Sequence, residues 1–190
     1  ILEGNQGTGK STSLNFLAPK GTFGDQLPPM DNKDASSYLK GKVFIELGEL
    51  SFLSKSKIEV VKSFITRRHE DFRPAYGREE LQRPRTCVFV GTTNRTDYLR
   101  DDTGNRRFLP IKTGEIDLEG LKDVRDRLWG AAAHAYDANE PYWLTGEVLA
   151  YAGQEAEQRQ ETDVWVETIR EKLGRFTEIT LNEAINHCHG

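Results

Sequence analysis

Short apolar runs recur along the chain and predict the buried strands of a sheet. The two clearest runs are residues 43–47 and 87–94, and the second ends in polar residues. Residues 108–111 form a third candidate, and the apolar pair Ile1 and Leu2 has the composition expected at the end of another strand. Runs of this kind are typical of strands that are covered on both faces of a sheet.

Helical periodicity fills most of the chain between and after these runs. Apolar residues recur three or four positions apart there, as they do on the buried face of a helix. The helices predicted in this way span residues 11–18, 34–39, 58–67, 117–136, 145–161 and 162–173. Strands separated by helices indicate an α/β fold with a parallel sheet. The strands stop before residue 117, which predicts a helical extension at the C-terminal end.

A glycine-rich loop opens the chain. Its residues, Gly-Asn-Gln-Gly-Thr-Gly-Lys-Ser at positions 4–11, fit the phosphate-binding pattern G-x-x-x-x-G-K-[ST]. In such a loop the backbone N–H groups surround phosphates, Lys10 reaches the β- and γ-phosphates, and the Ser11 hydroxyl ligates Mg²⁺. The predicted ATP-binding residues are Gly4, Asn5, Gln6, Gly7, Thr8, Gly9, Lys10, Ser11 and Thr12. The alternative is a turn that matches by chance, but the strand before the loop and the helix after it favour the nucleotide site.

The loop stands unusually close to the first residue. A strand that feeds such a loop normally has about five residues, and only Ile1, Leu2 and Glu3 precede the loop here. The sequence also lacks an initiator methionine. We therefore expect the chain to be part of a longer protein with further sequence upstream.

Composition narrows the class of protein. Hydrophobic residues make up 36% of the 190 positions, enough for a packed core. No apolar run approaches the roughly 20 residues of a membrane-spanning helix, so we expect no membrane partner. The chain contains two cysteines, Cys87 and Cys188, which is consistent with a reducing cytoplasm.

The net charge of −4 hides an uneven distribution. Residues 55–112 carry 14 basic and 8 acidic side chains, whereas residues 113–190 carry 7 basic and 16 acidic ones. A basic region beside a nucleotide site suggests contact with a polyanion. The alternative is that these arginines serve the nucleotide or only solvate the surface.

The basic region is densest between residues 67 and 85. Tyr76, Gly77 and Arg78 have the composition of a turn, so this segment is consistent with a hairpin whose tip lies there. Arginine binds phosphate and aromatic rings stack on bases, so Arg73, Tyr76 and Arg78 are predicted to contact single-stranded DNA. A solvated hairpin with structural aromatic residues is the alternative.

Carboxylates follow the glycine-rich loop on the next apolar run. Glu46 lies in the run of residues 43–47, and Glu49 follows it closely. In nucleotide hydrolases a carboxylate at this point holds Mg²⁺ and polarises the attacking water. Both glutamates can act together only if the chain bends at Gly48, because alternate residues of a strand face opposite ways. The alternative is a glutamate that only contacts solvent.

Two further polar groups belong at the same edge of the predicted sheet. Asn94 ends an apolar strand, where an amide can orient water against the γ-phosphate; a turn-forming asparagine is the alternative. Arg106 and Arg107 precede the run of residues 108–111, where one of them can serve as an arginine finger. The alternative for these arginines is an ion pair with Asp101 or Asp102.

The order of these motifs resembles the virulence-associated protein E family, which is similar to superfamily 3 helicases of phages, prophages and mobile islands. The motifs that carry the resemblance are residues 4–12, 43–50, 73–78, 88–94 and 104–108. The resemblance covers roughly residues 1–145, which we expect to form the ATPase core. Residues 146–190 would be the helical extension and the possible start of a winged-helix unit.

The resemblance implies an AAA+-like P-loop fold, a homo-oligomeric ring, often a hexamer, and ATP- and Mg²⁺-dependent unwinding of single-stranded or forked DNA. It also implies replication of a mobile element in the cytoplasm of a bacterial host and an upstream primase domain. Carried over by position, Lys10 and Ser11 bind phosphates and Mg²⁺, Glu46 and Glu49 serve the metal and water, and Asn94 is the sensor. Arg106 or Arg107 is the finger, and Tyr76 to Arg78 form the DNA-facing tip. The Glu-x-x-Glu pattern departs from the adjacent acidic pair of the broader superfamily.

Two other functions stay open from the sequence. Many small-molecule kinases use the same loop, so a phosphotransferase is one alternative. A nucleotide-gated initiator or loader that binds DNA without unwinding it is the other, and the helices predicted after residue 162 keep it open.

Overall fold

A parallel sheet forms the centre of the fold. The computed structural model describes residues 1–48, 58–72, 79, 81–99, 107–161 and 180. Within these residues, five parallel strands have the spatial order β2-β3-β6-β1-β7. They are β1 (Leu2–Glu3), β2 (Phe23–Gly24), β3 (Phe44–Gly48), β6 (Val88–Thr93) and β7 (Ile111–Lys112). The predicted α/β class with a parallel sheet is therefore confirmed.

The first strand is short but lies inside the sheet. Leu2 of β1 is in register with Thr92 of β6 on one side and with Ile111 of β7 on the other. The strand β6 lies between β1 and β3, so the glycine-rich loop and Glu46 start from strands that are not neighbours. The carboxyl ends of parallel strands meet at one edge, which is where ligands bind in such sheets.

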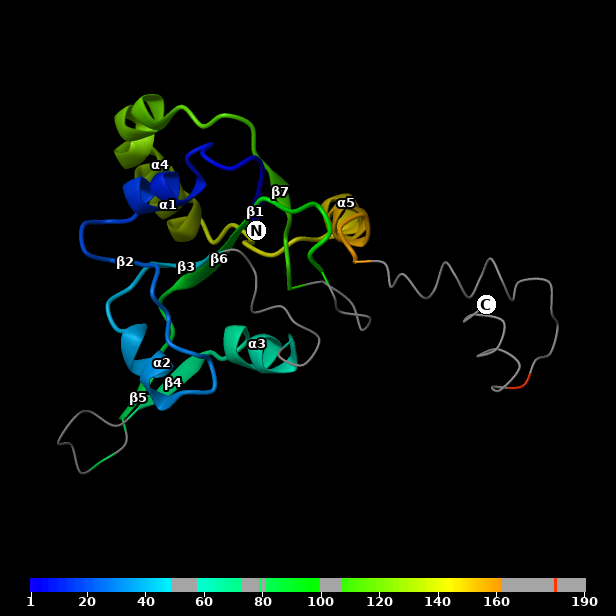
Figure 1. The fold of residues 1–190 in the computed structure, drawn as a ribbon. Coiled ribbons are helices and arrows are strands. Elements are labelled where there is room, and N and C mark those ends of the chain that lie inside the picture. Colours follow the sequence, from blue (N-terminus) through cyan, green and yellow to red (C-terminus); the bar gives the residue numbers. More distant parts are fainter. Residues whose placement is uncertain (49–57, 73–78, 80, 100–106, 162–179, 181–190) are drawn as a thin grey trace.

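Helices cover both faces of the sheet. They are α1 (Lys10–Leu17), α2 (Lys33–Tyr38), α3 (Ile58–Ile65), α4 (Leu118–Asp137) and α5 (Gly146–Glu157). Figure 1 shows α1 and α4 on one side of the sheet, with α2 and α3 on the other. The indole of Trp129 on α4 donates a hydrogen bond to the Leu17 carbonyl of α1 (2.8 Å) and packs against Phe44 of β3.

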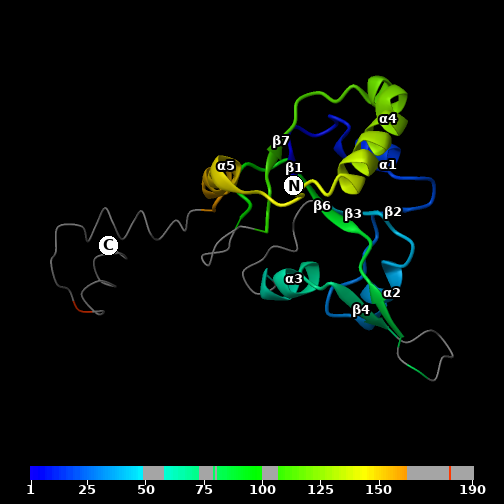
Figure 2. The ribbon, with the colours of Figure 1, turned by 180° about the vertical axis from the view of Figure 1, so that it is seen from behind.

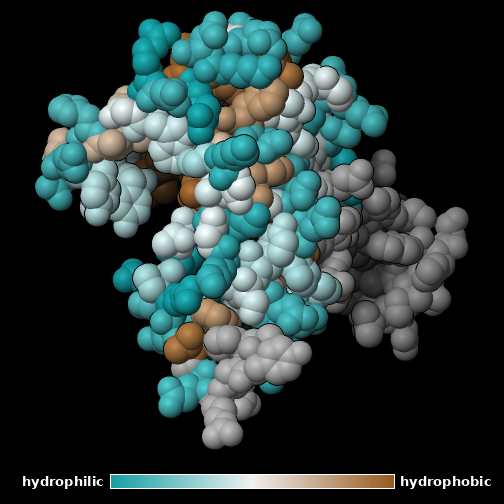
Figure 3. Space-filling model, turned by 90° about the vertical axis from the view of Figure 1, so that its left-hand side faces the viewer, coloured by the Kyte–Doolittle hydropathy of each residue, from teal (hydrophilic) through white to brown (hydrophobic). Residues whose placement is uncertain are grey.

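Two clusters of buried side chains form the core on the opposite face. One joins α2, β3 and α3 and consists of Ala35, Leu39, Ile45, Leu47 and Phe64. The other joins α3 and α5 to the segment after β6 and consists of Ile58, Val61, Tyr98, Leu99, Phe108 and Ala156. The end of α5 is therefore packed into the same body as the sheet. On the face shown in Figure 3, hydrophilic residues predominate and the apolar areas are small.

A hairpin projects from the lower end of the molecule. Its strands β4 (His69–Phe72) and β5 (Leu81–Pro84) pair antiparallel and form a sheet of their own. Figure 2 shows the hairpin pointing away from the parallel sheet. The predicted hairpin is thus confirmed, while its expected tip, Arg73, Tyr76 and Arg78, lies outside the described residues.

A buried ion pair anchors the base of this hairpin. The guanidinium of Arg85 donates to the Glu70 carboxylate (2.6 Å from Nε to Oε1) and to the Phe64 carbonyl of α3 (2.6 Å). Ser36 of α2 donates to the other oxygen of Glu70 (2.6 Å), and Arg85 lies over the ring of Phe89 on β6. These contacts therefore connect the hairpin to α2, to α3 and to the central strand β6.

Two predicted boundaries differ from the structure, and one strand has no counterpart among the predicted elements. That strand is β2, which forms because Phe23 and Gly24 pair with Phe44 and Ile45 of β3. The strand expected at residues 108–111 is β7 at Ile111–Lys112, since Phe108 packs in the core and proline 110 has no N–H group to donate. The helix expected over 145–161 ends at Glu157, after which the chain turns to pair with Leu99.

The remaining predictions for the fold concern the C-terminal end and membranes. The helix expected at residues 162–173 and the start of a winged-helix unit lie outside the described residues. In the part of the chain that the structure does describe, none of the helices is long and apolar enough to cross a membrane.

The Glu70–Arg85 pair gives a test of the hairpin anchor. We expect Glu70→Gln to lower the free energy of unfolding by about 3–5 kcal/mol, because it leaves a buried guanidinium without its counter-charge. The matched control is Asp71→Asn, since Asp71 is an exposed neighbour on β4 that accepts one hydrogen bond from Gln82. The control should cost less than about 0.5 kcal/mol. Urea denaturation measures both, and equal losses would contradict the anchor.

Candidate functional site

A cavity lies at the carboxyl edge of the parallel sheet, between the glycine-rich loop and two strand ends. Its volume is about 520 Å³. The residues that line it are Gln6 to Thr12, Glu46, Gly48, Thr92, Thr93, Asn94 and Arg95. The loop, the carboxylate and the amide that the sequence assigned to one site therefore surround one space.

The glycine-rich loop has backbone angles that favour glycine. Gly7 and Gly9 have φ values of 82° and 90°, a region that side chains disfavour. Gly4 is needed for another reason, because a Cβ there would lie 2.7 Å from the carbonyl oxygen of Thr113. Helix α1 begins directly after Gly9. Its N-terminal N–H groups and dipole favour an anion at this edge of the cavity.

The ammonium group of Lys10 sits at the centre of the loop. It donates to the carbonyls of Gly4 (2.9 Å) and Asn5 (2.7 Å) and to the amide oxygen of Asn94 (3.1 Å). Only 7% of Lys10 is exposed, so these oxygen atoms replace water around its charge. A buried cation held in this way, within a loop of glycines at a helix start, is suited to bind a phosphate group.

One carboxylate oxygen of Glu46 accepts hydrogen bonds from two hydroxyl groups. Ser11 donates to Oε1 at 2.6 Å and Thr92 donates to the same atom at 2.7 Å. Within the described part of the chain, Oε2 of Glu46 forms no hydrogen bond. A serine hydroxyl beside a carboxylate provides the hard oxygen ligands that Mg²⁺ prefers. No group of three or more His, Cys, Asp or Glu side chains suited to a metal occurs among the described residues. A cation here would therefore also need oxygen atoms from a ligand.

The other predicted site residues have different outcomes. Asn94 lies at the cavity as expected, joined to Lys10. Arg107 is exposed and does not line this cavity. Glu49 and Arg106, like the predicted DNA contacts, fall outside the residues that the structure describes.

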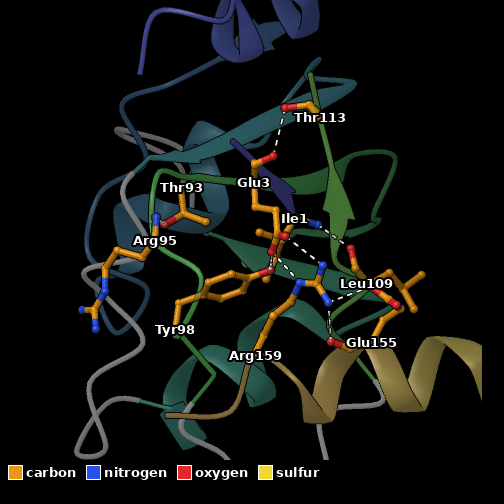
Figure 4. A network of polar contacts seen from close by, with 9 residues as sticks. All are labelled: Ile1, Glu3, Thr93, Arg95, Tyr98, Leu109, Thr113, Glu155 and Arg159. Atoms are coloured by element: carbon orange, nitrogen blue, oxygen red, sulfur yellow. Dashed lines mark hydrogen bonds and ion pairs between the residues drawn. The ribbon is translucent and has the colours of Figure 1, made fainter. Parts of the chain in front are cut away.

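Sequence reasoning missed a buried ionic network at the start of the glycine-rich loop (Figure 4). Arg159, just beyond α5, donates to both carboxylate oxygens of Glu3, at 2.8 Å for the Nη2–Oε1 bond. The same guanidinium pairs with Glu155 (2.7 Å), and the Tyr98 hydroxyl donates to Glu3 (2.9 Å). Glu3 immediately precedes the glycine-rich loop, so the network holds the start of that loop.

Three groups of this network have pKa values that are shifted from their usual values. Burial raises the pKa of the Glu3 carboxyl, but the hydrogen bonds from Arg159 and Tyr98 outweigh burial and hold this pKa below its usual value. The hydrogen bond to Glu3 raises the pKa of the Arg159 guanidinium, and burial raises the pKa of the Tyr98 hydroxyl above its usual value. The pair is therefore ionised at neutral pH, with Tyr98 as a neutral donor.

The sequence holds only a faint signal for these residues. Glu3 is a charged side chain at the end of a buried strand, which is unusual unless it is paired. Glu155 and Arg159 have the four-residue spacing of a helical ion pair. Nothing local relates Arg159 to Glu3, because 156 positions separate them.

The family follows from a comparison of the whole chain with known families. The model of the virulence-associated protein E-like domain matches residues 1–162. The chain belongs to this family. The match confirms the family predicted from the order of the motifs, and it continues into α5 beyond residue 145. No curated protein matches the sequence.

Two solved structures with some similarity to this chain show a region of one other protein. A structure described as the A form apo structure of the NrS-1 C-terminal region has 19% sequence identity and a TM-score of 0.40. The match covers 84% of this chain and 33% of that one. A second structure with this description has 21% identity and a TM-score of 0.44, over 83% and 34% of the two chains. This chain thus spans about a third of each of these two chains.

Gly9 gives a test of the loop geometry. We expect Gly9→Ala to lower the free energy of unfolding by about 1–3 kcal/mol, because alanine is strained at its positive φ. The matched control is Gly153→Ala on α5, where a Cβ meets open space. Because alanine is the better helix former, the control should be neutral or stabilising by up to about 1 kcal/mol. Equal stability of Gly9→Ala and the wild type in urea would contradict the strain.

Proposed function

We propose that this chain is the ATP-hydrolysing motor core of a DNA helicase or translocase that acts in the replication of a phage or mobile element. The observation that carries the proposal is the convergence of Lys10, Asn94 and the Ser11–Glu46–Thr92 cluster on one cavity. Membership of the virulence-associated protein E-like family supports the biological setting.

The glycine-rich loop is proposed to bind the phosphates of ATP. Its N–H groups and the start of α1 favour the negative charge, and Lys10 brings a buried cation to it. Ser11 and Glu46 would hold Mg²⁺, which when bound neutralises charge on the β- and γ-phosphates. The residues present fit such an ion, since two hard oxygen ligands lie 2.6 Å apart at the cavity wall.

Glu46 and Asn94 are proposed to act on the attacking water. In hydrolysis, a water oxygen bonds to the γ-phosphorus, the bond to the β-phosphate oxygen breaks, and ADP and phosphate leave. Glu46 has one carboxylate oxygen held by Ser11 and Thr92, so the other can accept a hydrogen bond from that water. Asn94, which already contacts Lys10, would orient the water or the γ-phosphate. Glu49 is proposed to support Glu46.

The hairpin is proposed to contact single-stranded or forked DNA. Its described part carries the exposed Arg83, which lies over the ring of Phe72 at 5.1 Å. An arginine held against an aromatic ring offers both charge and a flat surface to a nucleic acid. Arg73, Tyr76 and Arg78 are the proposed contacts at the tip.

A homo-oligomeric ring, often of six copies, would complete the active site. Arg107 is exposed and outside the cavity of its own chain, which is compatible with action on a neighbouring copy. Arg106 or Arg107 would then stabilise the charge of the transferring phosphoryl group. We also propose that a primase domain precedes this chain in the full-length protein and that the protein acts in the cytoplasm of a bacterial host.

A second cavity keeps the phosphotransferase alternative open. It has a volume of about 320 Å³ and shares Glu46 and Gly48 with the first. Its other walls include Pro28, Met30 and Val60. A kinase would need such a space for an acceptor beside the γ-phosphate.

The test is the rate of ATP hydrolysis by the full-length protein with and without single-stranded DNA. We expect DNA to raise the rate, and Lys10→Ala to lower the stimulated rate by on the order of 10²-fold or more, because the phosphate loses its cationic partner. The control is Lys20→Ala, an exposed lysine beyond α1 that should leave the rate unchanged.

The alternatives predict different results. A rate of ATP hydrolysis that does not change when DNA binds would favour a nucleotide-gated loader. Hydrolysis without any DNA binding, together with phosphate transfer to a small acceptor, would favour a phosphotransferase. If Lys10→Ala hydrolysed ATP at the wild-type rate, the assignment of the nucleotide site to the glycine-rich loop would be wrong.

A further inference from the structure

The segment that carries Asn94 is fixed at both ends and exposed between them. Residues 94–97 are exposed, whereas Tyr98 and Leu99 are buried in the core. At the near end, the carbonyl of Thr93 on β6 accepts the N–H of Gly4 (3.2 Å). The position of Asn94 therefore depends on its hydrogen bond from Lys10 and on what holds Tyr98 and Leu99 at the far end.

Arg159 holds that far end through its backbone. The carbonyl of Arg159 accepts the N–H groups of Tyr98 (3.1 Å) and Leu99 (3.0 Å). The carbonyl of Leu99 in turn accepts the N–H of Glu161 (2.8 Å). Arg95, directly after Asn94, also lies within 3.8 Å of the Glu161 carboxylate. The turn after α5 is thus bound to the segment after β6 by backbone hydrogen bonds and an ion pair.

The side chain of the same arginine reaches the other part of the site (Figure 4). Its guanidinium forms the two-pronged contact with Glu3, at the start of the glycine-rich loop, and Tyr98 donates to the same carboxylate. One residue therefore connects the loop that would bind phosphate and the segment that bears the amide. Arg159 is 7% exposed, so solvent screens this connection weakly.

We propose that Arg159 is a positioning residue that, together with Tyr98, keeps Asn94 at the γ-phosphate end of the cavity. The inference rests on the proposed nucleotide site. It assigns to the turn after α5 a role in distinguishing ATP from ADP. Arg159 acts through Tyr98 and Glu3, and the group that touches the nucleotide is Asn94.

The two halves of the site depend on Arg159 to different degrees. The start of the loop has other supports, because β1 pairs on both sides and the Glu3 carbonyl accepts the N–H and hydroxyl groups of Thr113 (2.7 and 2.9 Å). The segment after Asn94 is held at its far end by the 159–161 turn and by the burial of Tyr98 and Leu99 in the core. Disturbing the network should therefore weaken recognition of the γ-phosphate more than binding of the diphosphate.

The experiment measures the affinities of the full-length protein for Mg²⁺-ADP and for a non-hydrolysable Mg²⁺-ATP analogue. The variants are Tyr98→Phe, which removes one hydroxyl and keeps the ion pair, and Arg159→Lys, which keeps the charge but cannot span both oxygens of Glu3. Asn94→Ala is the reference for complete loss of the amide. The control is Lys20→Ala, an exposed lysine beyond α1.

We expect the preference for the ATP analogue over ADP to fall about tenfold in Tyr98→Phe and Arg159→Lys, approaching that of Asn94→Ala, while the affinity for ADP changes less than about threefold. The turnover number per bound nucleotide should fall in parallel. Lys20→Ala should match the wild type. Normalising to the number of binding sites removes any unfolded fraction, which a purely structural role would change.

An unchanged preference in variants that bind nucleotide stoichiometrically would overturn the inference, as would a wild type without any preference. If Arg159→Lys does not fold, Tyr98→Phe decides alone. If the wild type binds both nucleotides but hydrolyses neither, the proposed motor function fails, and the ratio of affinities still decides the role of Arg159.

Discussion

A strand of two residues fixes the position of the glycine-rich loop in the candidate site. β1 pairs with β6 and β7 through Leu2 and Glu3, and the glycine-rich loop leaves the sheet directly after it. Gly4 passes so close to Thr113 that a methyl group would not fit. The short strand gains further support from the side chain of Glu3, which is held by a guanidinium from the far end of the described chain. The loop, its lysine and the start of α1 are all placed relative to this strand.

The hairpin and the site are connected through a single strand. β5 ends at Pro84 and β6 begins at Val88, so the base of the hairpin continues almost directly into the strand that ends beside the cavity. Arg85 lies in this junction and contacts Glu70 of the hairpin and the ring of Phe89. Thr92, which helps to hold Glu46, belongs to the same strand. A DNA-dependent motor would need such a physical path between the hairpin and the nucleotide site.

The sequence predicts the parts of the fold that carry strong local patterns. The apolar runs of β3 and β6, the glycine-rich loop and the polar hairpin all follow from composition and spacing, and the structure brings Lys10, Glu46 and Asn94 together as expected. The amino-acid sequence carries no comparable signal for β2, whose two residues become a strand only by pairing with β3. The contact of Thr92 with Glu46 and the pair of Arg159 with Glu3 join distant residues, and tertiary packing alone creates them.

In the proposed function, Glu46 activates water for a nucleotide that the glycine-rich loop holds. The most direct measurement compares Mg²⁺-ATP binding and hydrolysis in wild type and Glu46→Gln. Glutamine keeps the oxygen that can accept from Ser11 and Thr92 but loses the negative charge and the basicity. We predict that ATP still binds, with affinity within about tenfold of the wild type, while turnover falls by on the order of 10²-fold or more. Turnover that persists at the wild-type rate in Glu46→Gln would contradict the account.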